Sequence, residues 1–181
     1  MPHRFTREQG ALLVIDIQER LAAAMSPERL ARLVNRSKAA IEGAKALGLP
    51  IAATEQYPKG LGPTLKEIAE AIPGFAPVEK TEFNAFLPPI REKLSPRPSV
   101  LVVGMETHVC VFQTVRALKD AGLSPYVAVD AVLSRNDADY QQGLALCREL
   151  GAQLTTVEAA LFDAVGRAGS PEFKAISSAV K

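Results

Sequence analysis

The side chain in this sequence with the greatest capacity for covalent chemistry is the thiol of Cys110, one of only two cysteines. Four strand formers at 100–103 run into Gly104, and an apolar pattern of helical period begins after a short polar break. If Thr107 is the N-cap, Cys110 falls in the first helical turn, where unpaired N–H groups and the helix dipole favour thiolate. The turn therefore predicts a nucleophile, and the alternative is a small buried hydrophobe, the commoner role of a free cysteine.

Two charged side chains at the ends of other predicted strands have the chemistry that a reactive thiol needs. An apolar run at 11–15 ends at Asp16, and a short strand at 78–80 ends at Lys80. An Asp can accept the thiol proton and a Lys can hold anionic groups, so the three side chains form a candidate triad without histidine. Taken singly, Asp16 is as well explained as a helix N-cap, and Lys80 as a solvated lysine.

The elements that must position these side chains alternate between strands and helices. Strands are predicted over 11–15, 50–54, 78–80, 100–103, 125–129 and 153–156. Helices are predicted over 27–47, 65–71, part of 83–94, the segment after 107, 138–150, 157–165 and 171–180, with a loop over 55–63. This alternation predicts an α/β fold with a parallel sheet covered on both faces. In such sheets ligands bind beyond the carboxyl ends of the strands, where all three candidate side chains would lie if the first and fourth strands are neighbours.

Length and composition predict one globular domain over 1–181, since 48% of the residues are hydrophobic and 23% are charged. Lys and Arg number 21 against 20 Asp and Glu, so no basic surplus points to nucleic acid or an anionic membrane, and a small molecule is the expected partner. The N-terminus lacks an apolar signal core and no later run is long enough to span a membrane, which predicts a cytoplasmic protein with reduced cysteines. No glycine-rich phosphate loop follows Gly104.

Three motifs make the sequence resemble the isochorismatase-like cysteine hydrolases: LLVIDIQER at 12–20, EKTEFNAF at 79–86 and GMETHVCVFQT at 104–114. The likeness covers nearly the whole chain, is greatest to the isochorismatase domain-containing group, and extends to the related nicotinamidases and N-carbamoylsarcosine amidases. It implies a Rossmann-like three-layer sandwich, a six-stranded parallel sheet of order 3-2-1-4-5-6, and a homo-oligomer. It also implies a catalytic triad of Asp16, Lys80 and Cys110, in which the cysteine forms a thioester with an amide that water then hydrolyses.

The resemblance further implies a cis peptide bond between Met105 and Glu106. Such a bond would aim the backbone N–H groups of Glu106 and Cys110 at a developing oxyanion. Side chains near the predicted strand ends and the cysteine are candidate substrate contacts, each with a plain loop or core role as the alternative: Gln56, Tyr57, Phe83, Phe86 and His108.

The sequence departs from the family at the metal site of nicotinamidases. Their D-x-H motif after the second strand is replaced here by Glu55, Gln56 and Tyr57, and the only histidines are His3 and His108. We therefore expect no metal and no other cofactor. The retained cysteine favours cleavage of an amide C–N bond. A catalytically silent binding or scaffold protein of the same fold, or a vinyl-ether hydrolase of the isochorismate type, remains the alternative.

Overall fold

The computed structural model describes residues 4–181 and centres on a six-stranded parallel sheet of order β3-β2-β1-β4-β5-β6. Its strands are β1 (Gly10–Ile15), β2 (Ile51–Gln56), β3 (Val78–Lys80), β4 (Ser99–Met105), β5 (Ser124–Leu133) and β6 (Gln153–Thr155). The predicted strand order is confirmed. Because β1 and β4 are neighbours while β2 and β3 continue on the other side of β1, the order of the strands reverses between β1 and β4.

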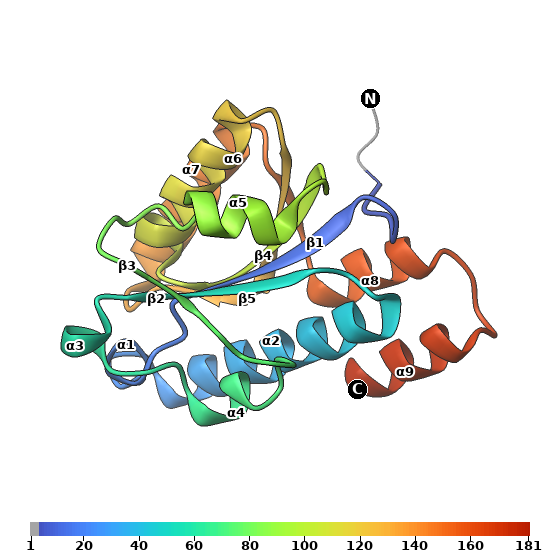
Figure 1. Ribbon diagram of the computed structural model, residues 1–181. Coiled ribbons are helices and arrows are strands. Elements are labelled where there is room, and N and C mark those ends of the chain that lie inside the picture. Colours follow the sequence, from blue (N-terminus) through green and yellow to red (C-terminus); the bar gives the residue numbers. More distant parts are fainter. Residues whose placement is uncertain (1–3) are drawn as a thin grey trace.

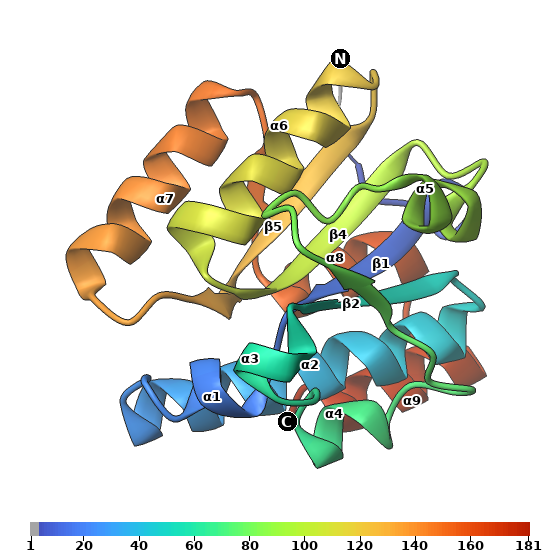
Figure 2. The same cartoon turned by 60° about the vertical axis from the view of Figure 1, so that its left-hand side comes forward.

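Helices cover both faces of the sheet (Figures 1 and 2). The face below the sheet in Figure 1 carries α2 (Pro27–Leu47), α4 (Lys66–Ala69), α8 (Val157–Val165) and α9 (Pro171–Ala179). The other face carries α5 (Pro88–Leu94), α6 (Phe112–Asp120) and α7 (Asp137–Glu149). The short helices α1 (Glu19–Ala22) and α3 (Pro58–Leu61) follow the carboxyl ends of β1 and β2.

Each face of the sheet has its own apolar cluster, and the period-two alternation of the strands divides side chains between the two. In β1, Leu12 and Val14 point into the cluster under α2, whereas Leu13 and Ile15 point into the cluster under α5, α6 and α7. Burial on both faces explains why the central strands are apolar along their whole length. The chain can become polar only where a strand ends, and at that edge the charged side chains gather.

The strand ends differ from the sequence prediction in one way that matters for the site. β2 continues to Gln56, so Glu55 and Gln56 belong to the strand and not to the predicted loop at 55–63. The parallel pairing of Glu55 with Glu79 and of Gln56 with Lys80 supplies the backbone partners that keep this polar segment extended.

Among residues 4–181 no helix combines the length and the apolarity needed to cross a membrane. The cytoplasmic location stays a prediction.

Candidate active site

Three segments meet at the carboxyl ends of the strands, next to α1 and α3 in Figure 1. Asp16 follows β1 directly, Lys80 is the last residue of β3, and Cys110 lies just beyond β4. The structure brings all three side chains together, and none of them is solvent-exposed. Because the carboxyl ends of parallel strands meet at one edge of a sheet, the sequence predicted only that these side chains share that edge. The following contacts define how the side chains face one another.

Asp16 and Lys80 form a fully buried ion pair. Lys80 Nζ donates to Asp16 Oδ2 at 2.7 Å, and Thr54 Oγ1 donates to the other carboxylate oxygen, Oδ1, also at 2.7 Å. A buried charge is stable only when it is paired and its remaining hydrogen-bonding positions are filled. Both carboxylate oxygens are occupied, so Asp16 is held in one orientation.

The ammonium of Lys80 has further acceptors around it. It donates to Gln56 Oε1 at 2.7 Å and to the backbone carbonyls of Glu82 and Phe83 at 3.2 and 3.3 Å. The sulfur of Cys110 lies 3.8 Å from the same nitrogen. Lys80 therefore touches both Asp16 and Cys110 and links the three side chains.

The thiol of Cys110 is protonated in the resting site. Burial raises its pKa to about 12, the negative charge of Asp16 adds to the rise, and the ammonium of Lys80 opposes it. Loss of hydration and the nearby carboxylate thus oppose the thiolate that the sequence predicts from the helix dipole. A reaction at this sulfur needs a base in contact with it.

The turn that carries Cys110 is a π-helix, η1 (Thr107–Val111), with Glu106 as its N-cap. Thr107 is thus the first helical residue and not the cap that the sequence predicted. The carbonyl of Glu106 accepts the N–H groups of Val109 at 3.1 Å and Val111 at 3.2 Å, the residues on either side of Cys110. Single π-turns inside helical segments are uncommon and are frequent at functional sites.

The backbone at the ends of β1 and β4 has unusual conformations. Asp16 has a φ of 50°, in the left-handed region that few residues other than glycine adopt. Gly104 has a φ of 130°, and a Cβ at this position would overlap the carbonyl oxygen of Ile15. Only glycine allows β4 to approach β1 this closely. The peptide bond between Met105 and Glu106 is cis.

Two side chains beside the cysteine turn make contacts elsewhere. The carboxylate of Glu106 accepts from the backbone N–H of Arg135 at 3.1 Å and from its Nε at 3.0 Å. The ring of His108 lies 3.0 Å from Ser134 Oγ through Nδ1 and 3.9 Å from Asp139 Oδ2 through Nε2. Both side chains therefore hold the segment between β5 and α7, and the role of His108 as a substrate contact stays a prediction.

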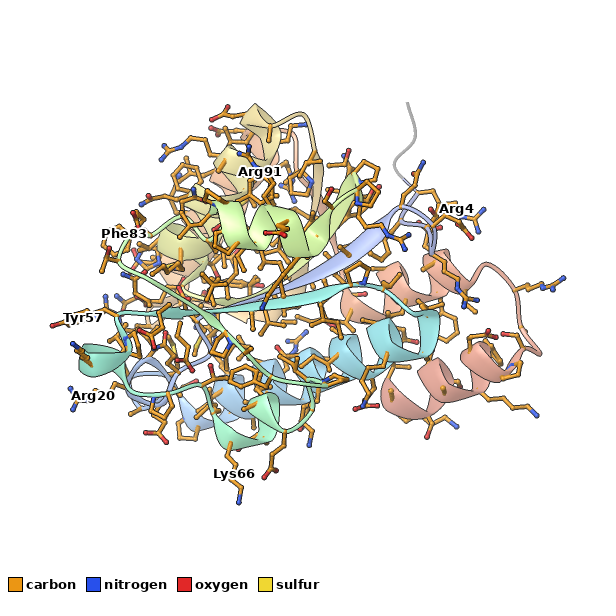
Figure 3. The ribbon with its side chains drawn as sticks, in the orientation of Figure 1. Arg4, Arg20, Tyr57, Lys66, Phe83 and Arg91 are labelled. Carbon is orange, nitrogen blue, oxygen red and sulfur yellow. The ribbon has the colours of Figure 1, made fainter. Side chains whose placement is uncertain are left out.

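Two aromatic side chains lie at the rim of the site. Tyr57 is 54% exposed and Phe83 is 50% exposed, and Figure 3 shows both on the same edge of the molecule. The backbone N–H of Tyr57 donates to the carbonyl of Lys80 at 2.8 Å, and the carbonyl of Phe83 accepts from Lys80 Nζ at 3.3 Å. Their backbones are therefore fixed relative to Lys80, while their rings remain open to solvent.

Phe86 requires a correction, because the structure places it in the core. Only 5% of this residue is exposed, and the guanidinium of Arg91 lies 5.1 Å from its ring centroid. The cavity that its ring borders is lined by residues that precede β4 and β5, at the amino ends of the strands. The site lies at the opposite ends of these strands, so Phe86 is a packing residue.

The positions that match the nicotinamidase metal motif have other partners here. Glu55 is buried, and its Oε1 accepts from both the backbone N–H and the hydroxyl of Thr64 at 2.7 Å. Within residues 4–181 no three His, Cys, Asp or Glu side chains cluster as a metal site would require. His3 lies outside the described residues.

Sequence reasoning missed Thr54 and assigned Gln56 only a pocket-lining role. Both side chains lie on the same face of β2, two residues apart, and bind the two members of the buried ion pair. The register pairs Thr54 with Val78 and Gln56 with Lys80. The sequence did contain a signal for both residues. Thr54 and Gln56 are two residues apart, so they share one face of β2 next to the Lys80 strand once β2 is extended to Gln56.

The order of the sheet and the position of the polar site at the reversal of strand order define a Rossmann-like α/β protein. Residues 10–159 match the Isochorismatase domain, and the chain belongs to this family. It is 38% identical over 173 residues to isochorismatase domain-containing protein 2 of Bos taurus, a match that covers 94% of this chain and 82% of the relative.

Solved structures agree with this assignment. The MAR1 ribonuclease of Caenorhabditis elegans superposes with a TM-score of 0.93 at 36% identity, over 98% of this chain and 92% of that one. The YcaC gene product of Escherichia coli, described as an octameric hydrolase of unknown specificity, has a TM-score of 0.81 at 21% identity, over 92% and 85% of the two chains. At that identity the second likeness shows the fold alone.

Proposed function

We propose that this protein is a hydrolase that cleaves the C–N bond of a small amide through a thioester on Cys110. The observation that carries the proposal is the contact of three buried groups, with Lys80 Nζ at 2.7 Å from Asp16 and 3.8 Å from the Cys110 sulfur. A nucleophile, a base and a fixed cation in contact are the parts that covalent acyl transfer needs. Membership in the isochorismatase family supports the hydrolase class.

In the first half-reaction Asp16 acts as general base. The Cys110 thiol is neutral at rest, so its proton passes to Asp16 as the sulfur attacks the amide carbon. The backbone N–H groups of Glu106 and Cys110 donate to the oxyanion, a contribution of about 3 kcal/mol per donor. Asp16 then gives the proton to the leaving nitrogen, the C–N bond breaks, and an amine or ammonia departs from the thioester.

In the second half-reaction water replaces the amine. Asp16 removes a proton from the water, whose oxygen attacks the thioester carbon and forms the new C–O bond. The C–S bond breaks, the sulfur recovers its proton, and the carboxylic acid leaves. Lys80 holds the Asp16 side chain in place throughout by their 2.7 Å contact.

Three finer features belong to the same proposal. The reaction uses no metal: Glu55, at a position that matches the nicotinamidase metal motif, is bound to Thr64, and Gln56 is bound to Lys80. The exposed rings of Tyr57 and Phe83 form the walls that contact the substrate. Gln56 lies behind them, where its Oε1 accepts from Lys80 Nζ. A homo-oligomer, which the family resemblance implies, is part of the proposal; the YcaC gene product, which shares the fold, is described as octameric.

A screen of small primary amides for ammonia release tests the proposal. We expect turnover by the wild type that a chelator leaves unchanged, and a loss of at least about a thousandfold in Cys110→Ala. Cys147→Ala is the matched control, because Cys147 is the other buried free cysteine and lies in α7 away from the triad. Mass spectrometry of the wild type with a slow substrate should detect the acyl group on Cys110.

Other outcomes would point to the alternatives. Hydrolysis of a vinyl ether that survives Cys110→Ala would indicate a vinyl-ether hydrolase, whose reaction needs no cysteine. No turnover and no acyl-enzyme with any amide would indicate a binding protein of this fold. RNA is assayed in parallel because the C. elegans relative is named a ribonuclease. RNA cleavage without amide hydrolysis would refute the proposal.

A further inference from the structure

Thr114 is a fully buried residue of the first turn of α6, and its hydroxyl joins two segments of the site. Oγ1 donates to the carbonyl of Cys110 at 2.6 Å and accepts from the backbone N–H of Ala85 at 2.8 Å. Both bonds lie in the protein interior, where an unpaired donor or acceptor is costly. One side chain thus satisfies a backbone group on the nucleophile and a backbone group on the loop after β3.

On the nucleophile side, the hydroxyl acts at the junction between η1 and α6. The carbonyl of Cys110 is four residues before Thr114, the position to which a helical threonine hydroxyl can bond back. This bond spans the change from π-helical to α-helical geometry at Phe112. The hydroxyl therefore fixes the orientation of the Cys110 peptide.

On the lysine side, the hydroxyl anchors the segment at 81–87. This segment supplies the carbonyls of Glu82 and Phe83 to the ammonium of Lys80. Its beginning is held by Gln56 Nε2, which donates to the carbonyl of Thr81 at 2.8 Å. Its other anchor is the bond from the N–H of Ala85 to Thr114. The two carbonyls on Lys80 lie between these anchors.

We propose that Thr114 is a positioning residue that couples the loop holding Lys80 to the turn holding Cys110, and so sets the separation of ammonium and sulfur during the reaction. The inference rests on the proposed function for its catalytic consequence. The linkage itself is independent of turnover, because the path from Cys110 through Thr114 to Ala85 consists of two hydrogen bonds of normal length.

The test compares Thr114→Val, which keeps the size but removes the hydroxyl, with Thr114→Ser, which keeps the hydroxyl. Ser37→Ala is the matched control, since Ser37 is also a fully buried hydroxyl residue of a helix, and its Oγ has no partner in the described chain. We expect Thr114→Val to lower kcat about tenfold or more with little change in KM, and Thr114→Ser to stay within about threefold of wild type.

A second readout does not depend on turnover. The rate of Cys110 alkylation by iodoacetamide is followed against pH in each variant. When the ammonium is no longer held near the sulfur, the rise of this rate with pH should move to higher pH in Thr114→Val and return in Thr114→Ser. A residue that serves only stability would lower the unfolding midpoint and leave this profile in place. If Thr114→Val does not fold, Thr114→Ala takes its place.

The proposal fails if the hydroxyl-free variant keeps both the wild-type kcat and the wild-type alkylation profile, or if Thr114→Ser is as impaired as Thr114→Val. It also fails if the Ala85 amide of the wild type exchanges with solvent as fast as an exposed loop amide. A failure of the proposed function looks different: no amide is hydrolysed by any variant, while the alkylation profiles and the exchange of the Ala85 amide still decide the role of Thr114.

Discussion

Replacing Asp16 by Asn should change two reactions of Cys110 in opposite directions. The substitution keeps the shape of the side chain but removes the charge that lies 2.7 Å from Lys80 Nζ. Amide hydrolysis loses its general base, so kcat/KM should fall by about 10²- to 10⁴-fold. Alkylation by iodoacetamide needs only the thiolate, and the charge of Asp16 is one of the causes that raise the pKa of Cys110. Alkylation should therefore become faster.

The magnitude follows from the resting ionisation of the thiol. With a pKa of about 12, the thiolate makes up roughly one part in 10⁴ at pH 8. Each unit by which the loss of the carboxylate lowers that pKa raises the thiolate, and with it the alkylation rate, about tenfold. Asp16→Asn also leaves the ammonium of Lys80 buried without a carboxylate, which should cost about 3–5 kcal/mol of unfolding free energy.

The assay measures ammonia release and the second-order alkylation rate on the same preparations, at a temperature where the variant is folded. Asp120→Asn, on the exposed end of α6, is the control that should change neither rate. Alkylation that slows in Asp16→Asn in parallel with hydrolysis would refute the reasoning, because it would mean that the carboxylate helps to form the thiolate in the resting site.

Three further predictions concern stability. Burial raises the pKa values of the Cys110 and Cys147 thiols from 9.0 to about 12, so above about pH 9 these thiols ionise first in the unfolded chain. The unfolding free energy should therefore fall by about 1.4 kcal/mol per pH unit for each thiol. Cys147→Ala should remove half of that slope, measured in urea titrations between pH 9 and 11. Gly104→Ala would force a Cβ against the Ile15 carbonyl at a φ of 130°, and we expect a loss of more than about 3 kcal/mol, measured as a lower urea midpoint or as loss of soluble protein. Phe86→Ala should cost about 3–5 kcal/mol in the same titration yet leave kcat/KM of the folded enzyme within about twofold, whereas a large rise in KM would restore Phe86 to the substrate site.

The fold was predictable because its signals are local and numerous. The apolar run before Asp16 and the helix at 27–47, which begins at a proline and ends at Gly48, are each specified by neighbouring residues. Strand order followed from the alternation of elements together with the family resemblance. The end of β2 was missed because Glu55 and Gln56 are polar residues kept extended by a neighbouring strand, which no local pattern records. The predicted end of β5 at 129 was also short of its end at Leu133.

The site was predictable as a set of strand-end residues, and its electrostatics were not. The ionisation of Cys110 depends on burial and on Asp16, which is distant in the sequence. The same limit applies to Phe86, whose position in a motif beside Lys80 gave no sign that its ring packs at the other end of the sheet. Burial is a property of the packed chain, so pattern reasoning finds the participants of a site before it finds their charge states.

The edge strand β3 is held both by its pairing with β2 and by the buried ion pair. β3 has three residues at the edge of the sheet, and of these only Lys80 is buried while Glu79 is exposed. The ion pair joins residues 64 positions apart in the sequence, Lys80 and Asp16. Because Lys80 is the last residue of β3, the triad is complete only when this strand has docked. If the proposed hydrolysis is correct, a chain in which β3 has not docked lacks Lys80 at the site and should be inactive.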